Sequence, residues 1–188
     1  WELAAPPTLE RVTLPGSPWS AEVPRGRSRQ QGDPSGSLTF GNLAHDASVV
    51  DIRWAPLGNE AKERDPSDEL SSIASELNEL PPGLEQLIPP RIVKDADRPE
   101  RPLVTVRYRY SGDSERVQEL AVGLVDGNQV SVNVSGWAEL PRAFDGLAAR
   151  ILRSFEPASA DSARRAGAAL GSVFHSGVPS PSVASQKN

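Results

Sequence analysis

Residues 68–80 repeat apolar side chains with the period of an α-helix. Polar residues separate them, so the apolar side chains share one face of a 3.6-residue repeat: Leu70, Ile73, Ala74, Leu77 and Leu80. Ser67 is the N-cap candidate, and acidic residues follow it in the first turn, where the helix dipole favours them. The pair Pro81–Pro82 ends the pattern. The sequence therefore predicts an amphipathic helix over residues 68–80.

A second helical pattern covers residues 141–155. Its apolar face consists of Phe144, Leu147, Ala148, Ile151, Leu152 and Phe155. Pro141 suits the start of a helix, and Pro157 lies just past the end. An apolar face of this width must pack on another apolar surface, because each large side chain it buries stabilises the fold by roughly 1.5–3 kcal/mol.

Between these helices, three segments alternate with the period of a β-strand: residues 104–110, 120–125 and 130–135. The connection Asp126-Gly127-Asn128 contains Asp-Gly, a strong hairpin signal. The sequence therefore predicts a three-stranded antiparallel meander. Its valine-rich face is the expected partner of the helix at 141–155, which would bury Leu147, Ile151 and Phe155.

The N-terminal part predicts further strands. Residues 9–14 and 19–23 flank the turn sequence Pro15-Gly16-Ser17-Pro18 and indicate a hairpin. Strands are also expected at 38–43 and 49–55, with a turn at 42–46. The polar segments 24–36, 56–66 and 94–102 are expected to be loops, and residues 84–92, between proline pairs, a short irregular helix.

The predicted fold is α+β, a single α/β/α sandwich in which helices flank a central antiparallel sheet of about six strands. Three parts are expected. Residues 1–8 form an extended lead, residues 9–157 the sandwich domain, and residues 158–188 a weak helix followed by a low-complexity tail rich in Pro and Ser.

Composition removes several classes of function. Hydrophobic residues make up 37% of the 188 residues and charged residues 24%, which is compatible with a packed domain. The net charge of −5 provides no field to hold a polyanion, so nucleic acid is not expected as a partner. The chain has no Cys, which excludes thiolate catalysis and zinc–thiolate sites. No apolar run reaches the ~20 residues of a transmembrane helix.

The chain begins at Trp1 and contains no Met, so either an N-terminal targeting segment has been removed or the chain has been trimmed. We expect the first, and with it a location outside the cytoplasm, in the periplasm or secreted. Association with a membrane is then expected only through a partner.

The sequence shows no catalytic constellation. The two histidines, His45 and His175, could join Asp46 or Asp51 in a metal site or a hydrolytic triad, but nothing in the sequence fixes their geometry, and no GxSxG motif is present. We therefore predict a protein without a catalytic site, metal or cofactor. An enzyme that uses His45, Asp46, Asp51 and the nearby arginine loop is the less favoured alternative.

Two segments are candidates for binding a partner protein. Arg25, Arg27 and Arg29 alternate on a Gly-containing loop and could bind an anion or an acidic partner. An ordinary solvated loop is the simpler interpretation of the three arginines. Near the C-terminus, Leu170, Val173 and Phe174 are too few to build a core and could instead anchor a helix in a partner's groove. An idle tail is the alternative there.

The order of elements resembles the PsbP and DcrB families. The residues that carry the resemblance are LPGSPWSAEVP (14–24), VSVNVSG (130–136) and FDGLAARILRSFEP (144–157). The resemblance implies an α/β/α sandwich that hosts extracytoplasmic lipoproteins, thylakoid-lumen photosystem subunits and a nuclear GTPase-release factor, none of which depends on a shared catalytic residue. It implies a non-catalytic accessory subunit or assembly factor that docks onto a larger protein complex. A small-ligand carrier with a cleft between sheet and helices is the alternative.

Overall fold

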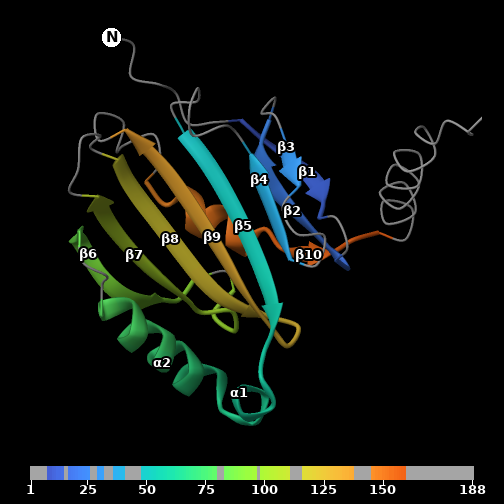
Figure 1. Ribbon diagram of the computed structural model, residues 1–188. Coiled ribbons are helices and arrows are strands. Elements are labelled where there is room, and N and C mark those ends of the chain that lie inside the picture. The colour runs from blue at the N-terminus through green and yellow to red at the C-terminus, as the bar shows by residue number, and fades with distance from the viewer. Residues whose placement is uncertain are drawn as a thin grey trace, which may run out of the picture.

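The computed structural model describes residues 8–14, 17–25, 29–31, 36–40, 48–79, 83–96, 98–110, 116–137 and 145–159 of the 188. These residues form an α+β fold with two antiparallel sheets (Figure 1). The large sheet has the strand order β3-β4-β5-β9-β8-β7-β6. Its strands are β3 (Arg29–Gln31), β4 (Ser37–Phe40), β5 (Ser48–Pro56), β6 (Leu84–Val93), β7 (Leu103–Tyr110), β8 (Arg116–Val125) and β9 (Asn128–Trp137).

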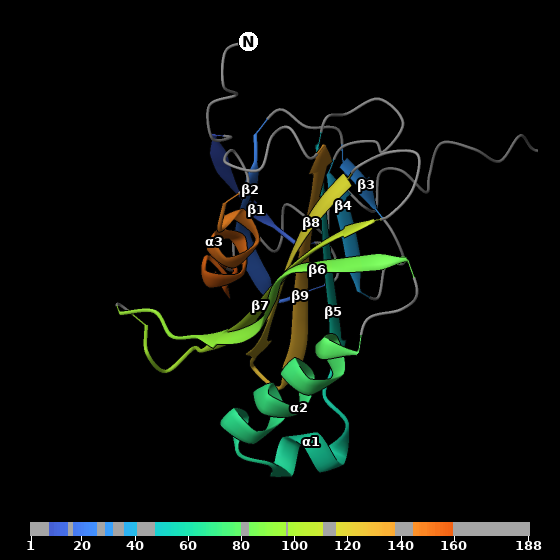
Figure 2. The ribbon, with the colours of Figure 1, turned by 90° about the vertical axis from the view of Figure 1, so that its left-hand side faces the viewer.

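The small sheet has the order β1-β2-β10, with β1 (Leu9–Thr13), β2 (Trp19–Pro24) and β10 (Glu156–Pro157). The helices are α1 (Asn59–Glu63), α2 (Pro66–Asn78) and α3 (Leu147–Arg153). Helix α3 and the small sheet lie on one side of the large sheet, whereas α2 packs on the other face against β6, β7 and β8 (Figure 2). The predicted fold class is thus confirmed. The large sheet has seven strands because it gains β3 and β6, while the N-terminal hairpin lies in a sheet of its own.

The alternation within the strands produces two cores, one on each face of the large sheet. On the α3 side, β8 and β9 contribute Ala121, Val130, Val132 and Val134, which pack with Leu147, Ile151 and Phe155. On the α2 side, Leu70 and Ile73 pack against Val104 and Val122. Because side chains alternate between the faces of a strand, one valine-rich sequence serves both cores.

The meander and its final helix confirm the prediction in most details. Leu147 is 2% exposed, and Ile151 and Phe155 are fully buried. At the β8–β9 turn, Asp126 and Gly127 have φ of 46° and 74°, as a two-residue hairpin of the I′ type requires. The predicted start of the helix at Pro141 lies outside the described residues. In the described part the helix begins at Leu147, after Gly146 with φ of 72°.

The N-terminal hairpin is also confirmed, and the C-terminal end of the described chain closes it. β1 pairs with β2, and β10 adds to the other side of β2. Trp19 is buried, and its ring lies 6.3 Å from that of Phe155, centroid to centroid. The small sheet therefore depends on residues from both ends of the predicted sandwich domain.

One predicted element is wrong. Residues 84–92, expected to be an irregular helix, form strand β6, which pairs with β7 along its length. The register shifts between Ile88 and Arg91, where Pro89 and Pro90 lie, because proline cannot donate to the ladder. The strand is an edge strand with bulges, the one context in a sheet that tolerates two prolines.

Two expected loops contain short elements. The connector 56–66 contains α1, and the loop 24–36 contains β3. The N-cap of α2 is Asp65 rather than Ser67: its carboxylate accepts from the backbone N–H of Ser67 at 2.8 Å. Pro66 occupies the first helical position, where its missing N–H costs nothing. The turn expected at 42–46 lies outside the described residues.

Candidate functional site

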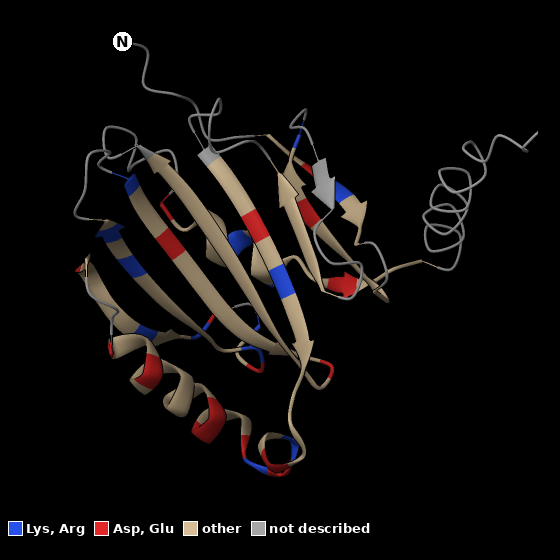
Figure 3. Ribbon diagram, viewed as in Figure 1, with Lys and Arg blue, Asp and Glu red and all other residues tan. Residues whose placement is uncertain are grey.

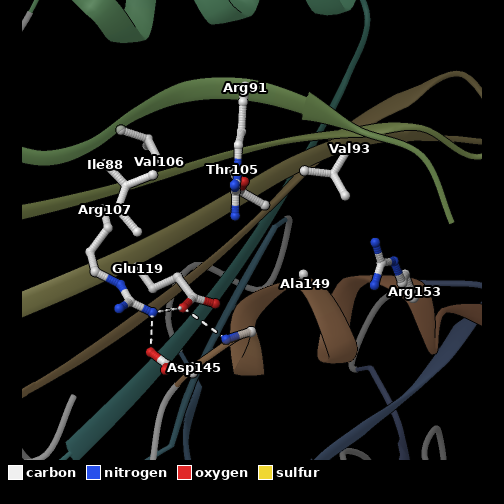
Figure 4. Close-up of a pocket in the computed structure, with 11 residues that line it drawn as sticks. Ile88, Arg91, Val93, Thr105, Val106, Arg107, Glu119, Asp145, Ala149 and Arg153 are labelled. Atoms are coloured by element: carbon white, nitrogen blue, oxygen red, sulfur yellow. Dashed lines mark hydrogen bonds and ion pairs between the residues drawn. The ribbon is translucent and has the colours of Figure 1, made fainter. Parts of the chain in front are cut away.

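A pocket of about 390 Å³ lies between the β6–β7 edge of the large sheet and helix α3 (Figure 4). We call it the arginine pocket, because three arginines line it. Its walls are formed by Ile88, Arg91 and Val93 of β6, Thr105, Val106 and Arg107 of β7, Glu119 of β8, and Asp145, Gly146, Ala149 and Arg153 at α3. It exists because β6 and β7 extend beyond the part of the sheet that α3 covers.

Glu119 organises one end of this pocket. Its carboxylate is buried and accepts from the backbone N–H of Gly146 at 3.0 Å and of Ala148 at 3.1 Å. It also accepts from the Nη2 of Arg107 at 2.8 Å. A buried carboxylate requires such donors, since an unpaired charge is costly in the interior. Glu119 therefore joins strand β8 to the start of α3.

Arg107 completes this network. It lies opposite Glu119 in the β7–β8 register, and its Nη2 also donates to Asp145 Oδ1 at 2.6 Å. Burial opposes the charged form of the guanidinium, but the hydrogen bonds and charges of Glu119 and Asp145 outweigh it and raise the pKa of Arg107. The group is fixed and permanently cationic, which suits a structural clamp.

The other end of the pocket contains Arg153 and Arg91. The Nε of Arg153 lies 3.1 Å from Asp95 Oδ2, yet it is buried and is not aligned to donate a hydrogen bond to any described group. Arg91 is exposed at the mouth, and its side chain makes no hydrogen bond or ion pair with the described part of the chain. In Figure 4 both guanidinium groups lie in the space between β6 and α3. Ile88, Val93 and Ala149 supply an apolar wall.

A second feature lies on the same edge of the sheet. Among the described residues, three large hydrophobic side chains are exposed: Leu87 (39%), Ile92 (41%) and Tyr110 (45%). Leu87 and Ile92 belong to β6, and Tyr110 ends β7 opposite Leu84 of β6. The ring of Tyr110 lies edge-on to that of Tyr108, 6.5 Å between centroids. We call Leu87, Ile92 and Tyr110 the apolar edge.

Charge is also distributed unevenly over the elements. Helix α2 has the acidic residues Asp68, Glu69 and Glu76 and no basic residue, whereas β7 has Arg107 and Arg109 and no acidic one (Figure 3). Arg109 is paired with Glu85 of β6 at 2.6 Å. Strand β7 therefore brings two arginines to the edge that contains the arginine pocket.

Most of the sequence-predicted site residues lie outside the described residues, namely Arg27, Leu170, Val173, Phe174, His45, Asp46 and His175. Arg25 is exposed just after β2, and Arg29 begins β3, although its side chain is not described. These partner-binding residues stay predictions. Asp51, the remaining member of the less favoured enzyme site, accepts from Thr39 Oγ1 at 2.9 Å and from Arg53 Nε at 2.7 Å on the surface of the sheet.

Sequence reasoning missed the arginine pocket. The alternation of β7 predicts a solvated side chain for Arg107, but this side chain is only 18% exposed because its face of β7 meets α3. The signal that could have indicated the pocket is Glu119. It is a charged residue beside the apolar pattern of a strand, and the predicted meander pairs it with Arg107. Arg91 and Arg153 gave no signal, since the strand that presents Arg91 was expected to be helical.

No protein-family model matches this chain, and no curated protein matches it by sequence. Solved structures do match this chain in fold. The solution structure of cyanobacterial PsbP (CyanoP) from Synechocystis sp. PCC 6803 matches with a TM-score of 0.56 at 13% identity, over 84% of this chain and 96% of that one. The fold is PsbP-like. A crystal structure of a protein from Bacteroides thetaiotaomicron matches with a TM-score of 0.54 at 11% identity, over 80% of this chain and 49% of that one.

The PsbP half of the predicted resemblance is therefore confirmed at the level of fold, while the DcrB half stays a prediction. The described residues contain no helix long and apolar enough to cross a membrane. Nor do they contain a group of three or more His, Asp or Glu residues that could hold a metal ion.

Proposed function

We propose that this protein is a non-catalytic accessory module that acts outside the cytoplasm and docks onto a protein partner. The observation that supports it is the apolar edge, where Leu87, Ile92 and Tyr110 are each more than a third exposed. Exposed apolar side chains are ordinary when scattered, but here all three occur on two adjacent strands, spaced along the β6–β7 edge from Tyr110, opposite the start of β6, to Ile92 near its end. A partner that covers them removes apolar surface from water.

A partner is expected to dock on the side chains of this edge rather than to add a strand to the sheet. Pro89 and Pro90 lie in the middle of β6, and the register shifts on either side of Ile88. An incoming strand would find missing donors and a bulged backbone there, which is how proteins keep an edge from pairing at random. The partner is therefore expected to present an apolar patch.

The acidic groups nearest to a possible reaction centre are already engaged. Glu119 holds three donors, and Asp145 holds Arg107. This supports a binding role. The proposed location rests on the PsbP-like fold and on the resemblance of the sequence to extracytoplasmic families.

The apolar edge can be tested with a double variant, Leu87→Glu with Ile92→Glu, used as bait in extracts of the source cells after chemical crosslinking. The control is Ala55→Glu, which places one such charge on an exposed position of β5. We expect the wild type and the control to capture the same protein and the double variant to lose it, with at least a tenfold weaker affinity when that protein is purified and titrated. Equal capture by all three chains would contradict docking through this edge.

The residues predicted from the sequence belong to the same proposal. The same titration with Arg25, Arg27 and Arg29 changed to Gln, and with a chain that ends at Ser159, measures whether the arginine loop and residues 170–174 take part. Unchanged affinity in either would exclude that segment from the contact.

A further inference from the structure

From the geometry of the arginine pocket we infer a binding site for a small organic carboxylic acid with an aliphatic or aromatic body, with Arg91 as the principal cation. The site is distinct from the apolar edge, and the inference holds whether or not a protein docks there.

The cationic end of the pocket leaves donors unused. The side chain of Arg91 has no hydrogen bond or ion pair with the described residues, and its planar fork suits the two oxygens of a carboxylate. The Nε of Arg153 is buried and lies 3.1 Å from Asp95 Oδ2, but it is not aligned to donate a hydrogen bond to that carboxylate. Buried donors are normally satisfied, and Arg153 lines the pocket, so this donor favours an acceptor that a ligand would bring.

The charges around the pocket limit the ligand to one negative charge. Glu119 and Asp145 lie at the opposite end and are both bound to Arg107, and Asp95 lies beside Arg153. Of the three arginines that line the pocket, Arg91 is the one whose side chain has no acidic partner among the described residues. A phosphate dianion would bring a second charge with no cation to match it, whereas a monocarboxylate would not.

The remaining wall is apolar. The side chains of Ile88, Val93 and Ala149 line the pocket, and its volume of about 390 Å³ lies within the range of small-molecule sites. Burying hydrocarbon against these side chains adds affinity in proportion to the area removed from water. A ligand with a charged head and a compact apolar body therefore uses both ends of the site.

The test is isothermal titration calorimetry of the full chain with hexanoate and benzoate, with hexanamide and inorganic phosphate as comparison ligands. We expect at least one of the two acids to bind. Hexanamide, which has the same body without the charge, and phosphate, which has charge without the body, should each bind at least tenfold more weakly. The inference is overturned if neither acid binds, or if hexanamide or phosphate equals the better acid.

Variants locate the site. Arg91→Gln removes the cation at an exposed position and should weaken acid binding at least tenfold. Ile88→Trp, a change at a half-buried position of the edge strand, should weaken it similarly by filling the pocket. The control is Arg53→Gln, which removes an arginine on β5 whose side chain is 71% exposed and lies outside the pocket. Binding that survives both pocket variants, or that is lost equally in the control, places the acid elsewhere and overturns the inference.

Discussion

Glu119 is the residue on which the start of α3 depends. Its carboxylate is buried, 8% exposed, and it holds Arg107 together with the backbone N–H groups of Gly146 and Ala148. Removing this carboxylate leaves two backbone N–H groups without their acceptor, at about 1–3 kcal/mol each, while Arg107 keeps Asp145 as a partner. The negative charge also lies where α3 begins, a position that the helix dipole favours.

We therefore expect Glu119→Ala to lower the free energy of unfolding by about 3–5 kcal/mol, and Glu119→Gln, which keeps the shape and some acceptor capacity, by about 1.5–3 kcal/mol. Urea unfolding followed by tryptophan fluorescence measures both values. The control is Glu85→Gln, since Glu85 is 55% exposed and its pair with Arg109 is a surface ion pair worth about 0–1 kcal/mol. If Glu119→Ala unfolds like the Glu85 control, Glu119 does not anchor the helix.

At the scale of elements, the clearest patterns gave the most reliable predictions. The meander and the helices near 68–80 and 141–155 could be predicted because their periods persist over many residues. Strand β6 could not, because Pro89 and Pro90 interrupt its alternation and resemble a break between elements. Its pairing with β7 is a long-range interaction that no local pattern contains.

The contact between α3 and β8 depends on a residue without a side chain. A Cβ at Gly123 would lie 3.1 Å from Leu152 Cδ2 and 3.6 Å from Leu103 Cβ, so glycine allows the helix to approach the strand closely. Gly123→Ala forces Leu152 to move, and overpacking of this kind costs about 1–3 kcal/mol. Leu152→Ala alone creates a cavity in the core and costs about 2–5 kcal/mol.

In the double variant, the methyl group added at position 123 enters space that the shortened side chain at position 152 has vacated. We expect its cost to be at least about 1 kcal/mol smaller than the sum of the two single costs, as a double-mutant cycle by urea unfolding would show. Costs that add within about 0.5 kcal/mol would mean that the two positions do not compete for the same space.

At the scale of the whole molecule, the candidate site arises where separate predictions meet. Arg107 and Glu119 come from a meander that the sequence predicts, and Arg153 from a helix that it also predicts. Their proximity to Arg91 follows only from the path of β6 along the edge of the sheet. The sequence therefore supplied the supporting elements of the pocket but not the pocket, because no single element contains it.

The two ends of the predicted domain, residues 9–157, are joined through the small sheet. β10 pairs with Trp19 and Ser20 of β2, and the N–H of Ala158 donates to the carbonyl of Pro18 at 2.7 Å. The carboxylate of Glu156 lies 3.0 Å from Arg11 and 3.2 Å from Arg98. These contacts lie within the described residues 156–159. Truncating the chain before and after this segment therefore tests whether the fold needs it.

A chain that ends at Ser159 keeps all of these contacts, and we expect its melting temperature to equal that of the full chain. A chain that ends at Phe155 loses the pairing of β10 and both ion pairs of Glu156. A backbone hydrogen bond contributes about 0.5–1.5 kcal/mol to stability, and the half-exposed ion pairs contribute less. The free energy of unfolding should therefore fall by about 1–3 kcal/mol. Because 1 kcal/mol corresponds to about 2–4 °C in a protein of this size, thermal unfolding of the three chains resolves it. A lower melting temperature already at Ser159 would show that residues 160–188 belong to the folded domain, because nothing else distinguishes that chain from the full one.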